Sequence, residues 1–218
     1  EQKLFDVSQQ SQLSQFTEVH SLLIKVMDDW SNRTKGTLTG IASGFSVLDN
    51  LLSGFQKSDL IILAGRPSMG KTALALCMAR NSAVDFKHKV GIFSLEMSNQ
   101  QLAERLITAE GRVDSHLVRT GRLPKNEWKN LAEAAGRLDE APIYIDDSAS
   151  LSILELRAKA RKLKSEKDID ILFVDYLQLL NHDGRSESRQ QEISFISRSC
   201  SAMKSSRFGF SPMLLANC

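Results

Sequence analysis

The sequence predicts an α/β fold with a mainly parallel sheet, and three observations support this prediction. An apolar stretch from Leu60 leads into Gly65-Arg-Pro-Ser-Met-Gly-Lys-Thr72, the pattern of a phosphate-binding loop between a strand and a helix. The run Ile169-Asp-Ile-Leu-Phe-Val-Asp175 is almost continuously apolar, as in a parallel strand that is buried on both faces. Strand-like and helix-like segments also alternate along the chain, which is typical of parallel strands joined by helices.

Residues 1–36 lack strand character and are predicted to form a helical linker segment, separate from a domain at 37–218. From Phe16 to Trp30 the apolar residues fall on one side of a helix. The polar stretch Ser8–Gln15 before it is typical of a linker. The apolar face either folds back on its own domain or docks on a neighbouring subunit, and the sequence leaves both open.

The domain that follows contains four predicted strands, at 58–64, 89–94, 142–146 and 170–175. Glycines punctuate the chain before the first strand, and a short helix is expected at Ser46–Leu52 with Ser46 as its N-cap. Capping boxes predict two helix starts, at Ser98 and Ser152. The predicted helices after the phosphate-binding loop are the Ala73–Ala79 run, Ser98–Gly111, Asp114–Thr120, Pro124–Asp139 with Pro124 in its first turn, and Ser152 to about Ser165.

The loop from Gly65 to Thr72 has the chemistry of a nucleoside triphosphate site, with ATP and Mg²⁺ as its expected ligands. The two glycines let backbone N–H groups approach the phosphates, Lys71 reaches the β- and γ-phosphates, and the Thr72 hydroxyl can bind Mg²⁺. The following helix directs its positive N-terminus at the same phosphates. The predicted nucleotide-binding residues are Gly65, Arg66, Pro67, Ser68, Met69, Gly70, Lys71 and Thr72.

Two acidic residues at strand ends are candidates for the hydrolytic chemistry. Asp175 ends the apolar run 169–175, and an acid at that position lies in the crevice where α/β sheets bind ligands. It is therefore predicted to hold Mg²⁺, together with Thr72, and to contact the nucleotide. Glu96 ends the second strand and could activate the attacking water, although spacing alone does not distinguish it from a surface acid.

Composition excludes several other classes of protein. The net charge of +2 is too small to indicate nucleic-acid binding by itself, so any contact with DNA must be local. The three cysteines have no metal-ligand or disulfide spacing, which fits a reducing cytoplasm. No apolar run approaches about 18 residues and the N-terminus lacks a signal-peptide form, so we expect a soluble protein with no membrane partner. The absence of an initiator Met suggests a fragment.

Four segments together resemble the C-terminal ATPase domain of DnaB-type bacterial replicative DNA helicases. They are Thr39-Gly-Ile-Ala-Ser-Gly-Phe45, the loop Gly65–Thr72, Phe93-Ser-Leu-Glu-Met97 and Asp175-Tyr-Leu-Gln-Leu179. They occur in the order and spacing of that family, and the resemblance covers about Phe16 to Ser199. Taken together they are far more specific than the phosphate-binding loop alone.

The resemblance implies a RecA-like P-loop NTPase fold for 37–218, acting as a 5′–3′ helicase motor at the replication fork. It implies Glu96 and Lys71 as catalytic residues and a homo-hexameric ring around single-stranded DNA. Primase and a helicase loader are the implied protein partners. Residues 1–33 resemble the family's linker region, whose helix docks on the adjacent subunit. In 181–190 the side chains of Arg185 and Arg189 could contact DNA phosphates, although a plain solvated loop is also compatible.

The end of the chain departs from the family pattern after Ser199 and resembles a frameshifted or truncated copy. The family's polar-sensor Gln, arginine finger and second DNA loop have no recognisable counterpart in Cys200–Cys218. In RecA-like sheets a late strand lies between the two strands that carry the nucleotide-binding motifs, so Met213–Asn217 would have to fill that position. Pro212 is acceptable only at the start of such a strand.

Three functions remain open from the sequence alone. The first is the helicase motor, and the second is another RecA-like ATPase, against which Asp175-Tyr-Leu-Gln-Leu179 argues. The third is a truncated chain that binds nucleotide and has little helicase activity. If the arginine finger is missing, the chain alone should hydrolyse ATP slowly and should not unwind duplex DNA.

Overall fold

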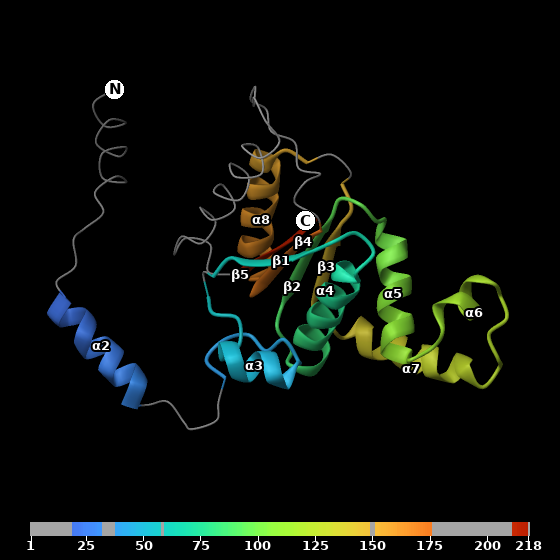
Figure 1. The fold of residues 1–218 in the computed structure, drawn as a ribbon, viewed down its shortest axis with the longest axis horizontal. Helices are drawn as coiled ribbons and strands as arrows, with labels where there is room; N and C mark the ends of the chain where they lie inside the picture. The colour runs from blue at the N-terminus through green and yellow to red at the C-terminus, as the bar shows by residue number, and fades with distance from the viewer. Residues whose placement is uncertain (1–18, 32–37, 58, 149–150, 176–210, 218) are drawn as a thin grey trace. The chain divides into compact units, whose positions relative to one another are not determined.

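The computed structural model describes residues 19–31, 38–57, 59–148, 151–175 and 211–217 (Figure 1). The chain divides into two compact units, Glu1–Thr37 and Leu38–Cys218. Among the described residues no helix is both long enough and apolar enough to cross a membrane.

The first unit contains helix α2, Val19–Ser31, where the sequence predicts a helix at Phe16–Trp30. The apolar stripe that predicted this helix is exposed to solvent, with Val19, Met27 and Trp30 each more than half exposed. A lone helix of this length cannot bury such a face by itself.

The second unit is built on five parallel strands in the order β1-β5-β4-β2-β3. Each of the four strands expected before the tail is present within a few residues of its predicted position. A run of mostly apolar residues forms each of them, which favours parallel strands covered by helices. The strands are β1, Ile61–Gly65; β2, Val90–Ser94; β3, Ile143–Asp146; β4, Ile171–Asp175; and β5, Ser211–Asn217.

Strand β5 lies between β1 and β4, as predicted for the end of the chain. Met213 is in register with Ile61 on one side and with Phe173 on the other. Pro212 is the second residue of the strand, close to its start, where a missing N–H donor is least damaging. In the sheet, β5 therefore separates the two strands that carry the nucleotide-binding motifs, β1 and β4.

Helices cover both faces of this sheet. Because side chains alternate along a strand, Leu172 and Val174 pack on the side of α8, while Ile171 and Phe173 pack on the side of α4 and α5. The helices of the unit are α3, Ser46–Leu52; α4, Lys71–Arg80, continued by a π-helical turn at Asn81–Asp85; α5, Asn99–Gly111; α6, Ser115–Arg119; α7, Glu127–Asp139; and α8, Ile153–Lys167.

Both predicted capping boxes are present. The Ser98 side chain accepts a hydrogen bond from the Gln101 N–H, and the Gln101 side chain accepts one from the Ser98 N–H. Ser152 and Glu155 form the same reciprocal pair at the start of α8. These caps set where both helices begin.

Two predicted helix starts are wrong. Ser46 is the first residue of α3, and the N-cap position is taken by Phe45, which has no side chain to accept a hydrogen bond. The loop before α3 is instead fixed by buried Asp49, whose carboxylate accepts the N–H groups of Ser43 and Gly44 at 2.8 and 3.1 Å. Helix α7 begins at Glu127, because Pro124 belongs to the turn before it.

Candidate nucleotide-binding site

The phosphate-binding loop connects the end of β1 to the start of α4. Gly65 ends the strand, Lys71 begins the helix, and the loop between them is exposed. Ser68 and Gly70 have positive φ angles of 63° and 84°, which turn the backbone around the concave side of the loop. Such a loop, followed by the first turn of a helix, directs backbone N–H groups at an anion.

The loop and the predicted Mg²⁺ ligand meet directly across the sheet. The Thr72 Oγ1 hydroxyl donates a hydrogen bond of 2.7 Å to Oδ2 of Asp175, although the two residues are 103 positions apart in the sequence. Asp175 ends β4 and is buried, whereas Thr72 lies in the first turn of α4. A hydroxyl oxygen and a carboxylate oxygen from separate elements therefore lie together at one point.

Glu96 is brought to the same end of the sheet by the turn after β2. The N–H of Leu95 donates to the carbonyl of Asp175 at 2.7 Å, which joins the ends of β2 and β4. Buried Ser94 fixes the turn, since its hydroxyl donates to the Met97 carbonyl at 2.8 Å and accepts the Met97 N–H at 3.1 Å. Glu96 is exposed, so water can reach its carboxylate.

The charges around Asp175 act in opposite directions. Burial is the main effect and raises the pKa of Asp175 above its ordinary value, and the negative charge of Glu96 adds to this rise. The hydrogen bond from Thr72 and the positive charges of Lys71 and Arg105 lower the pKa without cancelling the rise. A buried carboxylate with a raised pKa is stabilised by a cation, and hydroxyl and carboxylate oxygens suit Mg²⁺. Thr72 and Asp175 therefore fit the metal that the sequence predicts there.

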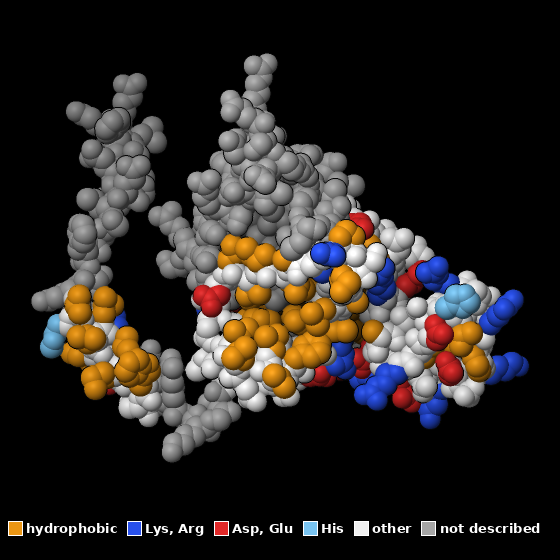
Figure 2. All heavy atoms as spheres, in the orientation of Figure 1, with side chains coloured by type: hydrophobic (Ala, Val, Ile, Leu, Met, Phe, Trp, Pro, Cys, Tyr) orange, Lys and Arg blue, Asp and Glu red, His pale blue; other side chains and the backbone are white. Residues whose placement is uncertain are grey.

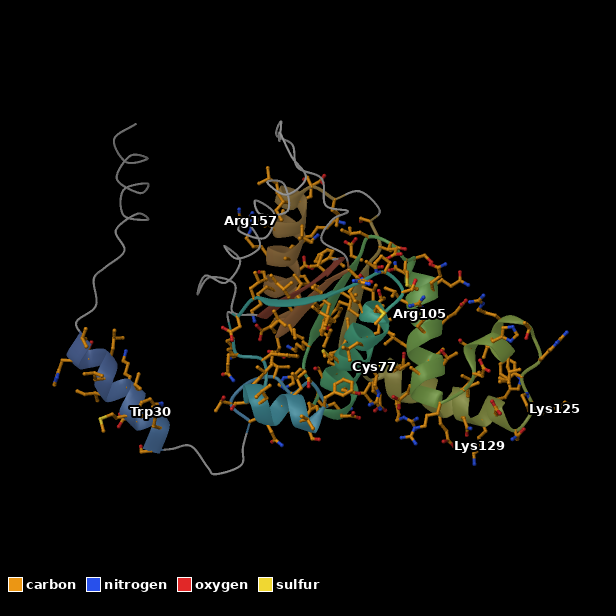
Figure 3. The ribbon with its side chains drawn as sticks, in the orientation of Figure 1. Trp30, Cys77, Arg105, Lys125, Lys129 and Arg157 are labelled. Carbon is orange, nitrogen blue, oxygen red and sulfur yellow. The ribbon has the colours of Figure 1, made fainter. Side chains whose placement is uncertain are left out.

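Arg105 is a residue of this site that the sequence analysis missed. It lies on α5, nine positions after Glu96, and its charge acts on Asp175. The capping box at Ser98 gave the start of α5, but the direction of the helix relative to the sheet is needed to place Arg105 near β4. Figure 3 shows Arg105 on α5 and Cys77 on α4.

A groove of about 1010 Å³ runs beside the site and is lined by α4, α5 and α6. At its base Glu110 of α5 is buried and receives hydrogen bonds from Arg80 of α4 and Arg137 of α7. Burial alone would raise the pKa of Glu110, but these two guanidinium groups outweigh it and hold the pKa below its usual value. The three charges fasten α4, α5 and α7 to one another.

The two predicted DNA contacts, Arg185 and Arg189, lie outside the described residues. The described part of the chain brings together Lys71, Thr72, Glu96 and Asp175 at the carboxyl end of the sheet. A parallel sheet with a phosphate-binding loop, an acidic strand end and a second acid beside it defines a P-loop nucleotide-binding protein of the RecA-like type.

Comparisons with known proteins place the chain within this class. Residues 40–206 match the model of the DnaB-like helicase C terminal domain family, so the chain belongs to that family. It is 46% identical over 206 residues to the replicative DNA helicase DnaB of Geobacillus stearothermophilus, and 43% identical over 201 residues to the replicative DNA helicase DnaC of Bacillus subtilis. These matches cover 93% and 91% of this chain, which spans 45% and 44% of the length of the two relatives.

Solved structures agree with the family assignment. The ATPase domain of G40P superposes with a TM-score of 0.85 at 30% identity, covering 93% of this chain and 72% of that one. A DnaB-like replicative helicase, solved in a study of its interactions with primase, gives a TM-score of 0.82 at 31% identity and covers 91% of this chain and 49% of its own. An aberrant sequence after Ser199 is not confirmed, because the family match continues to residue 206.

Proposed function

We propose that this chain is the ATP-dependent motor of a replicative DNA helicase. Residues 1–36 would be its linker segment and 37–218 its ATPase domain. The observation that carries the proposal is the hydrogen bond between Thr72 and Asp175, because it joins the phosphate-binding loop to the acidic strand end beside Glu96.

The residues of the site divide the chemistry among them. Lys71 and the loop amides bind the β- and γ-phosphates of ATP, while Thr72 and Asp175 hold Mg²⁺, directly or through water. When bound by these two residues, Mg²⁺ would neutralise charge that develops on the transferred phosphoryl group. Glu96 orients the attacking water and accepts its proton, for which its exposed position beside Asp175 is suitable. Arg105 adds positive charge at the same end of the sheet.

The partners of this motor follow from the relatives. Replicative DNA helicases act on DNA, so we propose that ATP hydrolysis drives movement of this chain along single-stranded DNA and unwinding of the duplex. We further propose assembly into a homo-hexameric ring and contact with a helicase loader. We also propose contact with primase, because one similar solved structure is a DnaB-like replicative helicase studied for its interactions with primase.

Substitution of Lys71 tests the first step of this proposal. Lys71→Ala removes the charge-assisted contact with the phosphates and should lower ATP affinity by at least about 10-fold. Titration with a fluorescent ATP analogue in the presence of Mg²⁺ measures this effect. Lys162→Ala removes an equal charge from the outer face of α8 and should leave the affinity unchanged.

A second assay separates a motor from a chain that only binds nucleotide. ATP hydrolysis is measured with and without single-stranded DNA, and strand separation is measured on a forked duplex. A helicase motor shows stimulation by DNA and ATP-dependent unwinding. Tight binding of ATP without either activity would overturn the motor function and leave a nucleotide-binding subunit.

A further inference from the structure

The segment from the end of α5 through α6 to the first turn of α7 has a local excess of basic residues. Residues 112–129 contain five Lys and Arg residues against two acids, so this segment alone carries +3, compared with +2 for the whole chain. We call this surface the basic tip. Its members are all exposed: Arg112, Arg119, Arg122, Lys125, Trp128 and Lys129.

The cations of the basic tip are not neutralised by their surroundings. Arg119, Arg122 and Lys125 form no ion pair or side-chain hydrogen bond with another described residue. Lys129 has only a loose contact of 3.8 Å with exposed Glu133. Figure 2 shows Lys and Arg side chains projecting from this end of the unit, with acidic side chains beside them.

An exposed tryptophan lies among these cations. Trp128 is 60% exposed, which is unusual for the residue that has the most apolar surface to bury. It lies in the first turn of α7, three residues after Lys125 and next to Lys129. Figure 3 shows Lys125 and Lys129 on the same projection.

Hydrogen bonds tie the backbone of the basic tip around α6. The Asp114 side chain accepts the His116 N–H at 2.8 Å, and the Thr120 hydroxyl donates to the His116 carbonyl at 2.8 Å. The Arg122 N–H then donates to the Leu117 carbonyl at 2.9 Å, which closes the turn. Cations on an ordered turn lose less conformational entropy when they bind a ligand.

We infer that the basic tip is a binding site for single-stranded nucleic acid. Guanidinium groups match the geometry of phosphates, and an exposed tryptophan offers a flat face on which an unpaired base can stack. A duplex would use the cations but would leave Trp128 without a base, because paired bases cover one another. The choice of nucleic acid over an acidic protein rests on the proposed helicase function.

Fluorescence of Trp128 gives the first test. The chain contains two tryptophans, so Trp30→Phe leaves Trp128 as the only one. Titration of this variant with an oligothymidylate of about 16 nucleotides, the upper site size of a single-strand-binding fold, should quench the emission as a base stacks. Emission that does not change while the oligonucleotide binds elsewhere would overturn the inference.

Charge removal gives the second test, measured by fluorescence anisotropy of a labelled oligothymidylate. The combined variant Arg119→Ala, Arg122→Ala, Lys125→Ala should bind about tenfold more weakly or worse at low salt. The slope of the logarithm of the binding constant against the logarithm of the salt concentration should become shallower by about 2. Each phosphate contact on a single strand adds about 0.7 to that slope. The matched control Arg161→Ala, Lys162→Ala, Lys167→Ala removes the same charge from exposed positions of α8 and should bind as before.

Trp128→Ala separates stacking from charge. It should weaken binding of the oligothymidylate about fivefold or more, and it should leave the dependence of that binding on salt concentration unchanged. An equal loss in both triple variants would mean general attraction by charge and would overturn the inference. The inference would also be wrong if the variant Arg119→Ala, Arg122→Ala, Lys125→Ala lost binding to a polyglutamate peptide but kept its binding to DNA. It would likewise be wrong if Trp128→Ala changed the sedimentation of the protein but left the anisotropy titration with DNA unchanged. Because ATP affinity is measured separately on Lys71→Ala, failure here is distinct from failure of the nucleotide site.

Discussion

At the scale of single residues, the charge of the Asp175 carboxylate depends on the groups around it. Its carboxylate is buried at the end of β4, and only Thr72 donates a side-chain hydrogen bond to it among the described residues. The site therefore holds a charge that is costly to bury until a cation compensates it. The positive charges that act on it come from two different helices, Lys71 of α4 and Arg105 of α5.

The affinity for Mg²⁺ and ATP should depend on pH through Asp175. Burial raises the pKa of Asp175, so its carboxyl takes up a proton at a higher pH than an exposed aspartate would. Metal binding requires the ionised form, and affinity should fall as the pH decreases towards that raised pKa. Titrations of Mg²⁺ with bound ATP between about pH 7 and pH 4 measure this.

Asp175→Asn is the control for that pH dependence. It should bind Mg²⁺ weakly throughout the range and lose the part of the pH dependence that comes from the protein. Protonation of the nucleotide phosphates affects both proteins equally, so the difference between their curves isolates Asp175. Curves that run parallel would show that another group binds the metal.

Glu96→Gln should separate binding from hydrolysis. The amide keeps the size of the side chain but cannot accept a proton, so hydrolysis should fall by about 10²-fold or more while ATP affinity is retained. Steady-state phosphate release and fluorescent ATP titration measure the two effects. Glu133→Gln, an exposed position on α7, should change neither. A small effect of Glu96→Gln on hydrolysis would assign the base to another residue.

At the scale of elements, β2 is packed closely against both α8 and the neighbouring strand β4 at Gly91. A Cβ atom at Gly91 would lie 2.8 Å from Leu172 Cδ1 and 2.9 Å from Leu163 Cδ2. Gly91 therefore lets the helix approach the strand closely. The opposite case is Gly136 of α7, where a Cβ atom would have no neighbour within 4 Å.

These two glycines make a matched pair of substitutions. Gly91→Ala should lower the free energy of unfolding by about 1–3 kcal/mol, because the leucine side chains must leave their preferred positions. Gly136→Ala should raise it by about 0.5–1 kcal/mol, because alanine favours a helix at a site with free space. Urea unfolding followed by circular dichroism measures both. Equal effects of the two changes would contradict the packing described for β2.

Much of this element-scale architecture could be predicted from the sequence. Ser98 and Ser152 are each followed by a capping partner three residues later. Both residues of each pair lie in the same helical turn, so the pairing does not depend on the rest of the fold and can be predicted from the sequence. Ser46 misled the prediction because the loop before α3 is held by Asp49, through contacts that only the folded chain creates. Arg105 was missed because its role depends on how α5 crosses the sheet.

At the scale of the whole molecule, the sheet depends on a strand from far along the sequence. The neighbour of β1 is β5, and their first paired residues are Ile61 and Met213. Without β5 the phosphate-binding loop would have no connection through the sheet to Asp175.

Leu214→Pro tests this dependence. Leu214 is in register with Ile62 on one side and Val174 on the other, so a missing N–H in the middle of the strand breaks the ladder. We expect a loss of about 3 kcal/mol or more in the free energy of unfolding, together with loss of ATP binding. Leu214→Val, which keeps the N–H, is the control and should retain both. A proline variant that unfolds like the control would show that β5 is dispensable.

The position of β5 in the sheet also has a consequence for synthesis on the ribosome. Strand β1 is made early, but about 150 residues must follow before the strand beside it exists. Until then the backbone N–H and C=O groups on that edge of β1 have no strand to pair with. Long-range pairing of this kind is slow and open to aggregation. The nascent chain therefore cannot complete its nucleotide site until translation has passed residue 217, and chaperones that shield strand edges should act on it before that point.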